Sequence, residues 1–250
     1  IDVAEMLRRK AEVVADPDDK RQTLQKLAEI YDDELRDPDE AIAVYRQVMA
    51  IDSTAIEALD ALERLYEQTD RWGDVTDVLR QRLVTEEADN LERRTEIELK
   101  LADILRSELY EAEDSIELYR VVLGREFEEG RQRAVRALEE LVDEPTYADL
   151  VADDLIAYYR DQQEWGALVE LLGQRRDQVA TPAERAELNH SIAGVYRERL
   201  DEPDEAIDAL AEAWTLQPDE ETYQAELVTL AEQQKSWERL AEVYRSVIPE

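Results

Sequence analysis

Residues 27–48 read LAEIYDDELRDPDEAIAVYRQV, and this stretch decides the fold. On both sides of Asp37 and Pro38 the apolar residues recur at spacings of three and four, the period of an α-helix. Proline is tolerated in the first turn of a helix, and the acids that follow Pro38 suit the positive end of the helix dipole. The stretch therefore predicts a helix, a short turn and a second helix.

We call this pattern type one, and it recurs without gaps at residues 101–122 and 192–213. A second pattern, type two, alternates with it and carries a tryptophan six residues after the end of its first apolar run, as at Trp72. Each unit is about one helix pair long, and internal repeats of this length are typical of stacked helical arrays. The first apolar residues of the units, here called landmarks, are Leu27, Leu62, Leu101, Leu155, Ile192 and Leu227.

The spacing predicts an all-α fold of about fourteen helices in antiparallel pairs, forming one α-solenoid over residues 1–250. A step of 54 residues between the third and fourth landmarks indicates an extra helix at 126–145. Because the chain begins in the middle of a unit, we expect it to be a segment of a longer array. The predicted units are a partial repeat at 1–16 and complete repeats at 17–53, 54–88, 89–125, 146–180, 181–217 and 218–250.

These units resemble tetratricopeptide repeats, through residues 27–48 and 192–213 and through Pro218 at the family's closing proline position. There are three departures: type one carries an extra residue between its helices, Ala28, Ala102 and Ala193 stand where the family often has glycine, and the tryptophan of type two opens the second helix. The resemblance implies a right-handed superhelix whose first helices line a concave groove. It also implies the binding of peptides or partner proteins. Trp72, Trp165 and Trp237 are expected to fill a recurrent gap between units, because a buried tryptophan contributes a large apolar area.

The charge balance excludes several classes of partner. The chain has 64 acidic and 30 basic residues, a formal net charge of −34, and every block of fifty residues is acidic. Binding to phosphates requires clustered lysine or arginine, so nucleic acid and anionic membranes are not expected as partners. A basic protein or peptide is electrostatically easier. The acidity has a second interpretation, as a bias of salt-tolerant organisms that keeps the chain soluble.

The sequence offers few residues that could catalyse a reaction or bind a metal ion. Cysteine is absent, and His190 is the single histidine. A metal site at His190 would need further ligands, and general acid–base catalysis would need a positioned partner. We therefore expect no cofactor and no enzyme activity. We expect His190 to be solvated or to line the groove. No run of apolar residues is long enough to span a membrane and no signal peptide is recognisable, so cytoplasm is expected, with periplasm left open.

The groove is the part of the sequence where function can be argued. Five residues after each landmark stand Asp32, Glu67, Arg106, Arg160, Arg197 and Glu232. The arginines are candidates to receive a partner's acidic groups, since guanidinium pairs bidentately with carboxylate, and Asp32 and Glu67 are candidates for basic groups. The alternative is that each arginine is already paired with a neighbour, namely Asp103, Asp161 or Glu198.

We therefore expect a non-enzymatic scaffold that holds a protein or peptide partner in its groove, with Asp32, Glu67, Arg106, Arg160, Arg197 and His190 as the groove residues. The alternative is a structural or regulatory spacer within a larger multidomain protein, with self-association through the ends of the solenoid. A helical enzyme that uses His190 and carboxylates is a third hypothesis.

Overall fold

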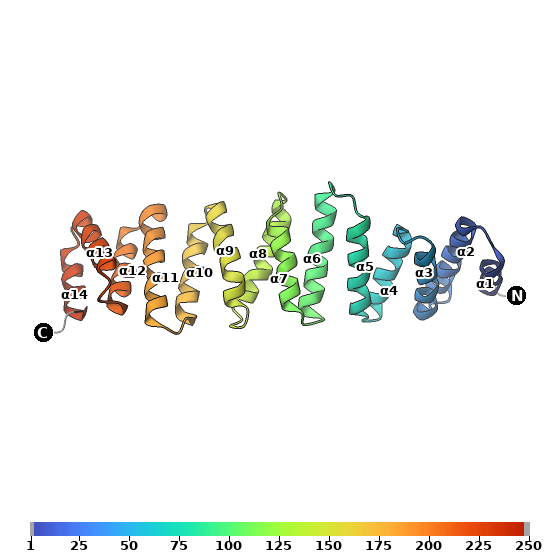
Figure 1. Cartoon of the computed structure of the whole chain (residues 1–250), viewed down its shortest axis with the longest axis horizontal. Helices are drawn as coiled ribbons and strands as arrows, with labels where there is room; N and C mark the ends of the chain where they lie inside the picture. The colour runs from blue at the N-terminus through green and yellow to red at the C-terminus, as the bar shows by residue number, and fades with distance from the viewer. Residues whose placement is uncertain (1–2, 248–250) are drawn as a thin grey trace. The chain divides into compact units, whose positions relative to one another are not determined.

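The computed structural model describes residues 3–247, and the regular structure in this range is helical throughout (Figure 1). This confirms the predicted all-α fold, and the fourteen α-helices of the described range match the expected number. They are α1 (Val3–Val13), α2 (Pro17–Glu29), α3 (Pro38–Ile51), α4 (Ile56–Gln68), α5 (Trp72–Thr85), α6 (Leu91–Ser107), α7 (Ala112–Leu123), α8 (Glu128–Val142), α9 (Ala148–Gln162), α10 (Trp165–Gln178), α11 (Pro182–Val195), α12 (Pro203–Leu216), α13 (Glu221–Gln234) and α14 (Trp237–Val247), with π-helical turns η1 (Ile30–Glu34) and η2 (Tyr196–Leu200).

Six helix hairpins account for most of these elements. Their first helices are α2 with η1, α4, α6, α9, α11 with η2, and α13, and their second helices are α3, α5, α7, α10, α12 and α14. Helix α1 precedes the first hairpin, and α8 is the extra helix expected at 126–145. One hairpin cannot bury its apolar face alone, and stacking of neighbours provides the core.

The chain divides into two compact units, residues 1–137 and residues 138–250, and the boundary falls inside α8. We call them the N-terminal unit and the C-terminal unit. The division falls in the region where the landmark spacing is irregular. A single solenoid over residues 1–250, and its right-handed superhelix, remain predictions.

The extra residue of type one is absorbed at the end of the first helix. The chain widens into π-helical turns at η1 and η2, and the Leu109 N–H likewise bonds five residues back, to the Ile104 carbonyl at 3.2 Å. A π-turn is the usual way in which a helix accommodates one inserted residue. A residue with positive φ then closes every hairpin turn, nine residues after the landmark in type one and eight in type two. In residues 3–247 the residues with positive φ are Arg36, Asp70, Tyr110, Gln163, Asp201 and Lys235.

Sequence-encoded caps fix the helix starts. The Asp37 carboxylate accepts a hydrogen bond from the Glu40 N–H at 3.2 Å, with Pro38 in the first turn as predicted. Thr181 and Glu184 form a reciprocal capping box at the start of α11. Such caps satisfy backbone donors that the helix itself leaves unpaired.

The tryptophans differ in burial. Trp72 packs against the core of the N-terminal unit, and Trp165 lies under the Arg199 guanidinium of the next hairpin, 4.9 Å from its ring centroid. Trp237, however, is 53% exposed. The expectation that it fills a gap between units is wrong, because no further hairpin follows α14 in the described residues to cover it.

In the described range, no helix is both long and apolar enough to cross a membrane.

Candidate binding face on the first helices

The six predicted groove residues lie on first helices or on the π-turns that end them. We call the surface formed by these elements the first-helix face, and describe it separately in each compact unit. Asp32 lies in η1, Glu67 on α4, Arg106 on α6, Arg160 on α9, His190 on α11 and Arg197 in η2.

In the N-terminal unit, Asp32 is paired with the neighbouring first helix. Its carboxylate is only 8% exposed and accepts hydrogen bonds from both terminal nitrogens of Arg64 on α4, one of them at 3.3 Å. The hydrogen bond to Asp32 raises the pKa of Arg64 above its ordinary value. A bidentate guanidinium–carboxylate contact satisfies both oxygens of a largely buried acid. Asp32 thus joins η1 to α4.

Glu67 takes part in a network between α4 and α6. Lys100 on α6 lies 2.5 Å from Glu67 and 2.5 Å from Glu63, and Glu63 also pairs with Arg82 on α5. Burial alone would raise the pKa of Glu63, but Lys100 and Arg82 outweigh burial, and its pKa lies below its ordinary value. The two acids likewise raise the pKa of Lys100 in spite of burial. The network ties two first helices to a second helix.

Arg106 reaches α8 within the same unit. Its guanidinium donates to the Ala137 carbonyl at 3.4 Å, and the neighbouring Asp103 accepts a hydrogen bond from the Tyr119 hydroxyl at 2.7 Å. In the N-terminal unit, therefore, each of the three predicted groove residues contacts an element two places further along the chain.

In the C-terminal unit, Arg197 and His190 converge on one acid. Arg197 lies 2.9 Å from Glu226 on α13 and 2.9 Å from Glu198, and His190 Nε2 lies 3.2 Å from the other Glu226 oxygen. The His190 ring also contacts the Tyr223 ring, with 5.0 Å between centroids and a tilt of 41° between the ring planes. Burial would raise the pKa of Glu226, but Arg197 and His190 lower it below its ordinary value. For Arg197, both the contact with Glu198 and a second contact across helices are present.

Arg160 differs from the other predicted groove residues in its contacts. It is exposed, and among the residues that the structure describes no side chain forms an ion pair with its guanidinium. The nearby Asp161, which the sequence offered as a partner, accepts a hydrogen bond from the Gln162 amide at 2.8 Å. Arg160 is thus an exposed cation on the first-helix face of the C-terminal unit.

The repeat itself explains this difference. The partners of Asp32, Glu67 and Arg197 stand on the following first helix, either one residue before its landmark or two residues after it. Arg64 stands two after Leu62, Lys100 one before Leu101 and Glu226 one before Leu227, each with the opposite charge. After Arg160, the same two positions hold Ser191 and Gly194, which carry no charge.

Sequence reasoning missed Arg64, Lys100 and Glu226, because partners were sought on the same helix. The signal that identifies them is an opposite charge at a fixed position of the next repeat, and it becomes visible only when consecutive units are aligned by their landmarks. Interdigitation of neighbouring repeats is the physical basis of that signal.

Among the hollows of the C-terminal unit, two adjoin Arg197 or Arg176. One, of about 370 Å³, is lined by Arg197 and by residues 225–233 of α13 and borders the Glu226 cluster. The other, of about 780 Å³, is bordered by Arg176, Asp208 and Glu212 and has the buried Asn189 at its floor. Arg176 there is paired with Asp177 and Glu212 and donates to Asn189. The smaller hollow belongs to the first-helix face.

In residues 3–247, no three or more histidine, cysteine or acidic side chains are grouped as a metal would require. His190 has Glu226 and Tyr223 as its neighbours, and an ion pair with Arg197 already engages Glu226.

Comparison with known proteins identifies the repeat. Residues 23–55 and 58–92 match the sequence model of the tetratricopeptide repeat. The two matches cover most of the first complete type-one unit and most of the type-two unit after it. This confirms the resemblance noted in the sequence. No curated protein matches the chain.

Several solved structures are similar over most of the chain. YrrB, described as a TPR protein with an unusual peptide-binding site, has 15% identity and a TM-score of 0.33, covering 90% of this chain and 98% of its own. The C-terminal part of a TPR repeat-containing protein from Cytophaga hutchinsonii has 14% identity and a TM-score of 0.30, covering 90% and 79%. BtubC (BKLC) from P. vanneervenii has 16% identity and a TM-score of 0.31, covering 86% and 87%.

Proposed function

The chain contains tetratricopeptide repeats, and we propose that it is a non-enzymatic interaction module that holds a partner protein or peptide on the first-helix face. Such repeats generally mediate protein–protein interaction. The finer proposal is that Arg160 receives an acidic group of the partner in the C-terminal unit.

The observation that carries this proposal is the Arg160 guanidinium, which forms no ion pair with any side chain of residues 3–247. Its equivalents Asp32, Glu67 and Arg197 are all engaged by the next first helix. An exposed arginine with its fork of donors unused is suited to bidentate recognition of a carboxylate. The smaller hollow beside Arg197 offers space for a partner side chain near the same face.

The net charge of −34 restricts the partner further. Long-range attraction favours a partner of net positive charge, and an acidic peptide would be repelled before it reached Arg160. We therefore propose a basic segment that carries one acidic side chain. The basic residues supply the attraction, and the acid fixes the register on Arg160.

The alternative function is a spacer or self-associating segment of a larger protein. It is favoured by the ion pairs that link successive first helices, because those charges stabilise the stack and are not available to a partner. Light scattering over a range of concentrations separates the two functions. A mass that rises with concentration favours the spacer.

The test of the proposal uses two lysine-rich peptides that differ only by a central Glu or Gln. We expect the full chain to bind the Glu peptide more tightly in fluorescence anisotropy, and Arg160→Glu to abolish the difference. Arg245→Glu is the matched control, since Arg245 is an exposed arginine on second helix α14 of the same compact unit. Equal loss in both variants, or equal binding of both peptides, would contradict the assignment to Arg160.

A further inference from the structure

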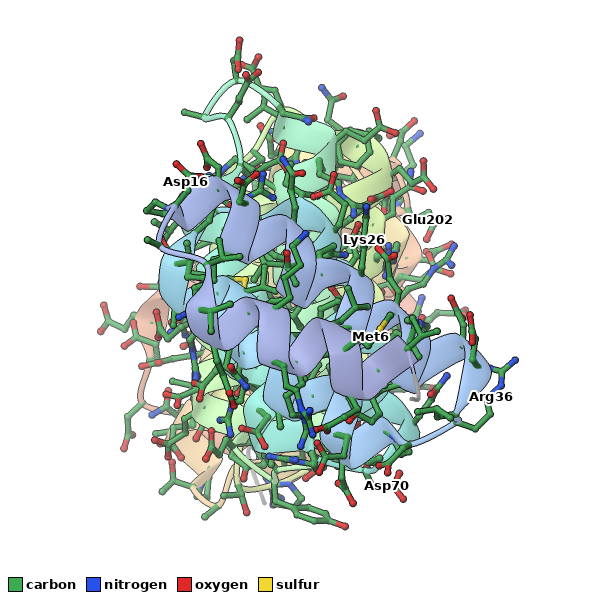
Figure 2. All side chains as sticks on the ribbon, turned by 90° about the vertical axis from the view of Figure 1, so that its right-hand side faces the viewer. Met6, Asp16, Lys26, Arg36, Asp70 and Glu202 are labelled. Carbon is green, nitrogen blue, oxygen red and sulfur yellow. The ribbon has the colours of Figure 1, made fainter. Side chains whose placement is uncertain are left out.

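A hollow recurs where a type-one hairpin packs against the helix before it. One lies among α1, α2 and α3 in the N-terminal unit, and the other is lined mainly by α10, α11 and α12 in the C-terminal unit. Aligning landmark Leu27 with Ile192, a shift of 165 residues, places most of their lining residues at equivalent positions. Figure 2 looks onto the N-terminal hairpin, with α1 nearest the viewer and with Asp16 and Lys26 marking the start and the last turn of α2.

The C-terminal hollow has the size of a small-molecule site. Its volume is about 780 Å³, against about 260 Å³ for its N-terminal counterpart, and such sites commonly measure about 300–1,000 Å³. Helix α9 precedes the three main lining helices, and α13 and α14 follow them, so the hollow does not arise at an end of the sequence.

The buried residue three positions before each type-one landmark differs in chemistry among the three hairpins. Leu24, 3% exposed, lines the N-terminal hollow, and in the next type-one hairpin Arg125 lies 2.5 Å from the equivalent Glu98. Asn189, 1% exposed, lines the C-terminal hollow. Its oxygen accepts a hydrogen bond from Arg176 at 3.2 Å, but no acceptor within residues 3–247 receives a hydrogen bond from its amide nitrogen. Leaving such a buried donor unpaired costs free energy, so the amide nitrogen is suited to an acceptor of a bound ligand.

A second group of donors lies on the same face of α11. Arg185 lines the same hollow four residues before Asn189, and residues at this spacing are neighbours on a helix surface. Arg185 Nε donates to the Val179 carbonyl at 3.1 Å, which anchors the side chain. The guanidinium is exposed and forms no ion pair in the part of the chain that the structure describes. Its terminal nitrogens and the Asn189 amide together suit a carboxylate, which can accept from both groups.

Two acids line the hollow from α12. Asp208 and Glu212 also stand four residues apart. Asp208 accepts a hydrogen bond from Arg239 on one oxygen, and Glu212 lies 3.5 Å from Arg176. Among the described residues, neither acid forms an ion pair with Arg185, and each has an oxygen that accepts no hydrogen bond. The hollow therefore offers donors from α11 and carboxylate oxygens from α12.

The N-terminal counterpart lacks most of these groups. Ala43 and Gln47 stand at the positions of the two acids, and Leu24 stands at the position of the buried amide. Lys20 alone keeps the charge of its equivalent, Arg185. Because the same hairpin forms without them, the polar groups of the C-terminal hollow are not required by the repeat fold.

We propose that the C-terminal hollow binds a small amphoteric group that presents a carboxylate and a cationic side chain, the chemistry of a basic amino acid. Arg185 and Asn189 bind the carboxylate, and Asp208 and Glu212 bind the cationic side chain. The net charge of −34 favours such a ligand, of net positive charge, over a simple carboxylic acid. The site is separate from the first-helix face and does not depend on the function proposed for it.

Isothermal titration calorimetry of the full chain with L-arginine tests the proposal. We expect saturable binding. Agmatine, which is arginine without its carboxylate, should bind about tenfold more weakly, because the contacts with Arg185 and Asn189 are lost. Norvaline, which keeps the carboxylate but has no cationic side chain, should also bind more weakly. Equal binding of arginine and agmatine would overturn the proposal, since attraction to the acidic surface would then account for the binding.

Two substitutions locate the site. Arg185→Gln and Asn189→Leu should each weaken arginine binding about tenfold, and the second introduces the residue that Leu24 already provides in the N-terminal hairpin. Lys20→Gln is the matched control, because Lys20 is the equivalent of Arg185 in the hollow without the acids, and it should leave the affinity unchanged. Far-UV circular dichroism checks that each variant remains folded. Equal effects of Arg185→Gln and Lys20→Gln would contradict the assignment.

A free amino acid and the C-terminal basic residue of a polypeptide share this chemistry, and the tripeptide Gly-Gly-Arg distinguishes them. It should bind at least as tightly as arginine if the site takes a chain end. It should bind more weakly if the site takes the free amino acid, because the tripeptide lacks the ammonium group beside the carboxylate. The absence of saturable binding by both arginine and the tripeptide would overturn the proposal.

Discussion

The two compact units treat the same repeat position in different ways. In residues 1–137, Asp32 and Glu67, five residues after their landmarks, are bound by cations of the next first helix, and Arg106 donates to a backbone carbonyl of α8. In residues 138–250, Arg197 is bound by Glu226, but Arg160 has no ion-pair partner in the described residues. The same position therefore contacts a later element of its unit in four repeats, whereas Arg160 and Glu232 are exposed and form no ion pair in the described residues.

The difference shows how a repeat array separates structure from recognition. Ion pairs between exposed charges contribute little, whereas a charge that is largely buried depends on its partner. Asp32 at 8% exposure belongs to the second group, and the exposed Arg160 belongs to neither. An array can keep its stacking charges fixed and leave a single position open for a partner.

Removing one cation from each unit is the strongest test of the difference between them. Arg64→Ala leaves the Asp32 carboxylate buried without its guanidinium, and should lower the free energy of unfolding by about 2 kcal/mol. Arg160→Ala, which removes no ion pair, should change it by less than about 0.5 kcal/mol. Hydrogen exchange over residues 17–68 and 148–195 locates each effect. Similar exchange in the two variants would show that the Asp32 contact contributes no more than an exposed charge.

Two glycines within helices, one in each compact unit, differ in the space that a larger side chain would find. A Cβ on Gly130 would lie 2.4 Å from Thr95 Cγ2 and 2.8 Å from the Phe127 ring, and Thr95 is fully buried, so Gly130→Ala should destabilise the chain by about 1–2 kcal/mol. A Cβ on Gly194 meets nothing within 4 Å. Gly194→Ala should therefore stabilise helix α11 by about 0.5–1 kcal/mol. Thermal unfolding of both variants tests the opposite signs, and a loss in Gly194→Ala would contradict the open space beside it.

Two glutamates should respond to pH in opposite directions. Burial raises the pKa of Glu98 despite Arg125 and Arg94, while Arg197 and His190 lower that of Glu226. Where folding lowers the pKa of a glutamate, the charged group stabilises the folded state above the pKa of the unfolded state. This stability is lost as the pH falls through the pKa of the folded state. A raised pKa means that stability falls as the pH rises from the unfolded pKa to the folded one.

Between about pH 3 and 6, the wild type should therefore gain stability with rising pH relative to Glu226→Gln and lose it relative to Glu98→Gln. Each change should be about 0.5–1 kcal/mol. Urea unfolding across this range measures both. Slopes of the same sign would show that one of the two environments is wrongly assigned.

The sequence predicted the helices and the hairpins because their signals are local. Apolar spacing, Pro38 and the acids that follow it predicted α3, and the irregular landmark spacing predicted α8. It did not predict how the extra residue of type one is absorbed, since a π-turn and a longer loop use the same residues. The partners of Asp32 and Arg197 were missed for a different reason. They lie about thirty residues away on another helix, and only the stacking of repeats brings them together.

The smallest expected effect tests the comparison most directly, because it supplies the ion-pair partner that Arg160 lacks among the residues that the structure describes. Ser191 stands one residue before the Ile192 landmark, the position that Lys100 and Glu226 occupy on their own first helices. Ser191→Glu should therefore pair with Arg160 and stabilise the C-terminal unit by about 0.3–0.5 kcal/mol. In the Arg160→Ala background the gain should vanish, which a double-mutant cycle of urea unfolding measures.

The same substitution should remove the preference for the Glu peptide, because Arg160 would then be engaged as its equivalents are. Ser191→Gln is the control, with a similar size and no charge. If Ser191→Glu gains stability and the preference remains, Arg160 is not the group that the partner's acid contacts. If neither changes, the pairing position seen at Lys100 and Glu226 does not extend to α11.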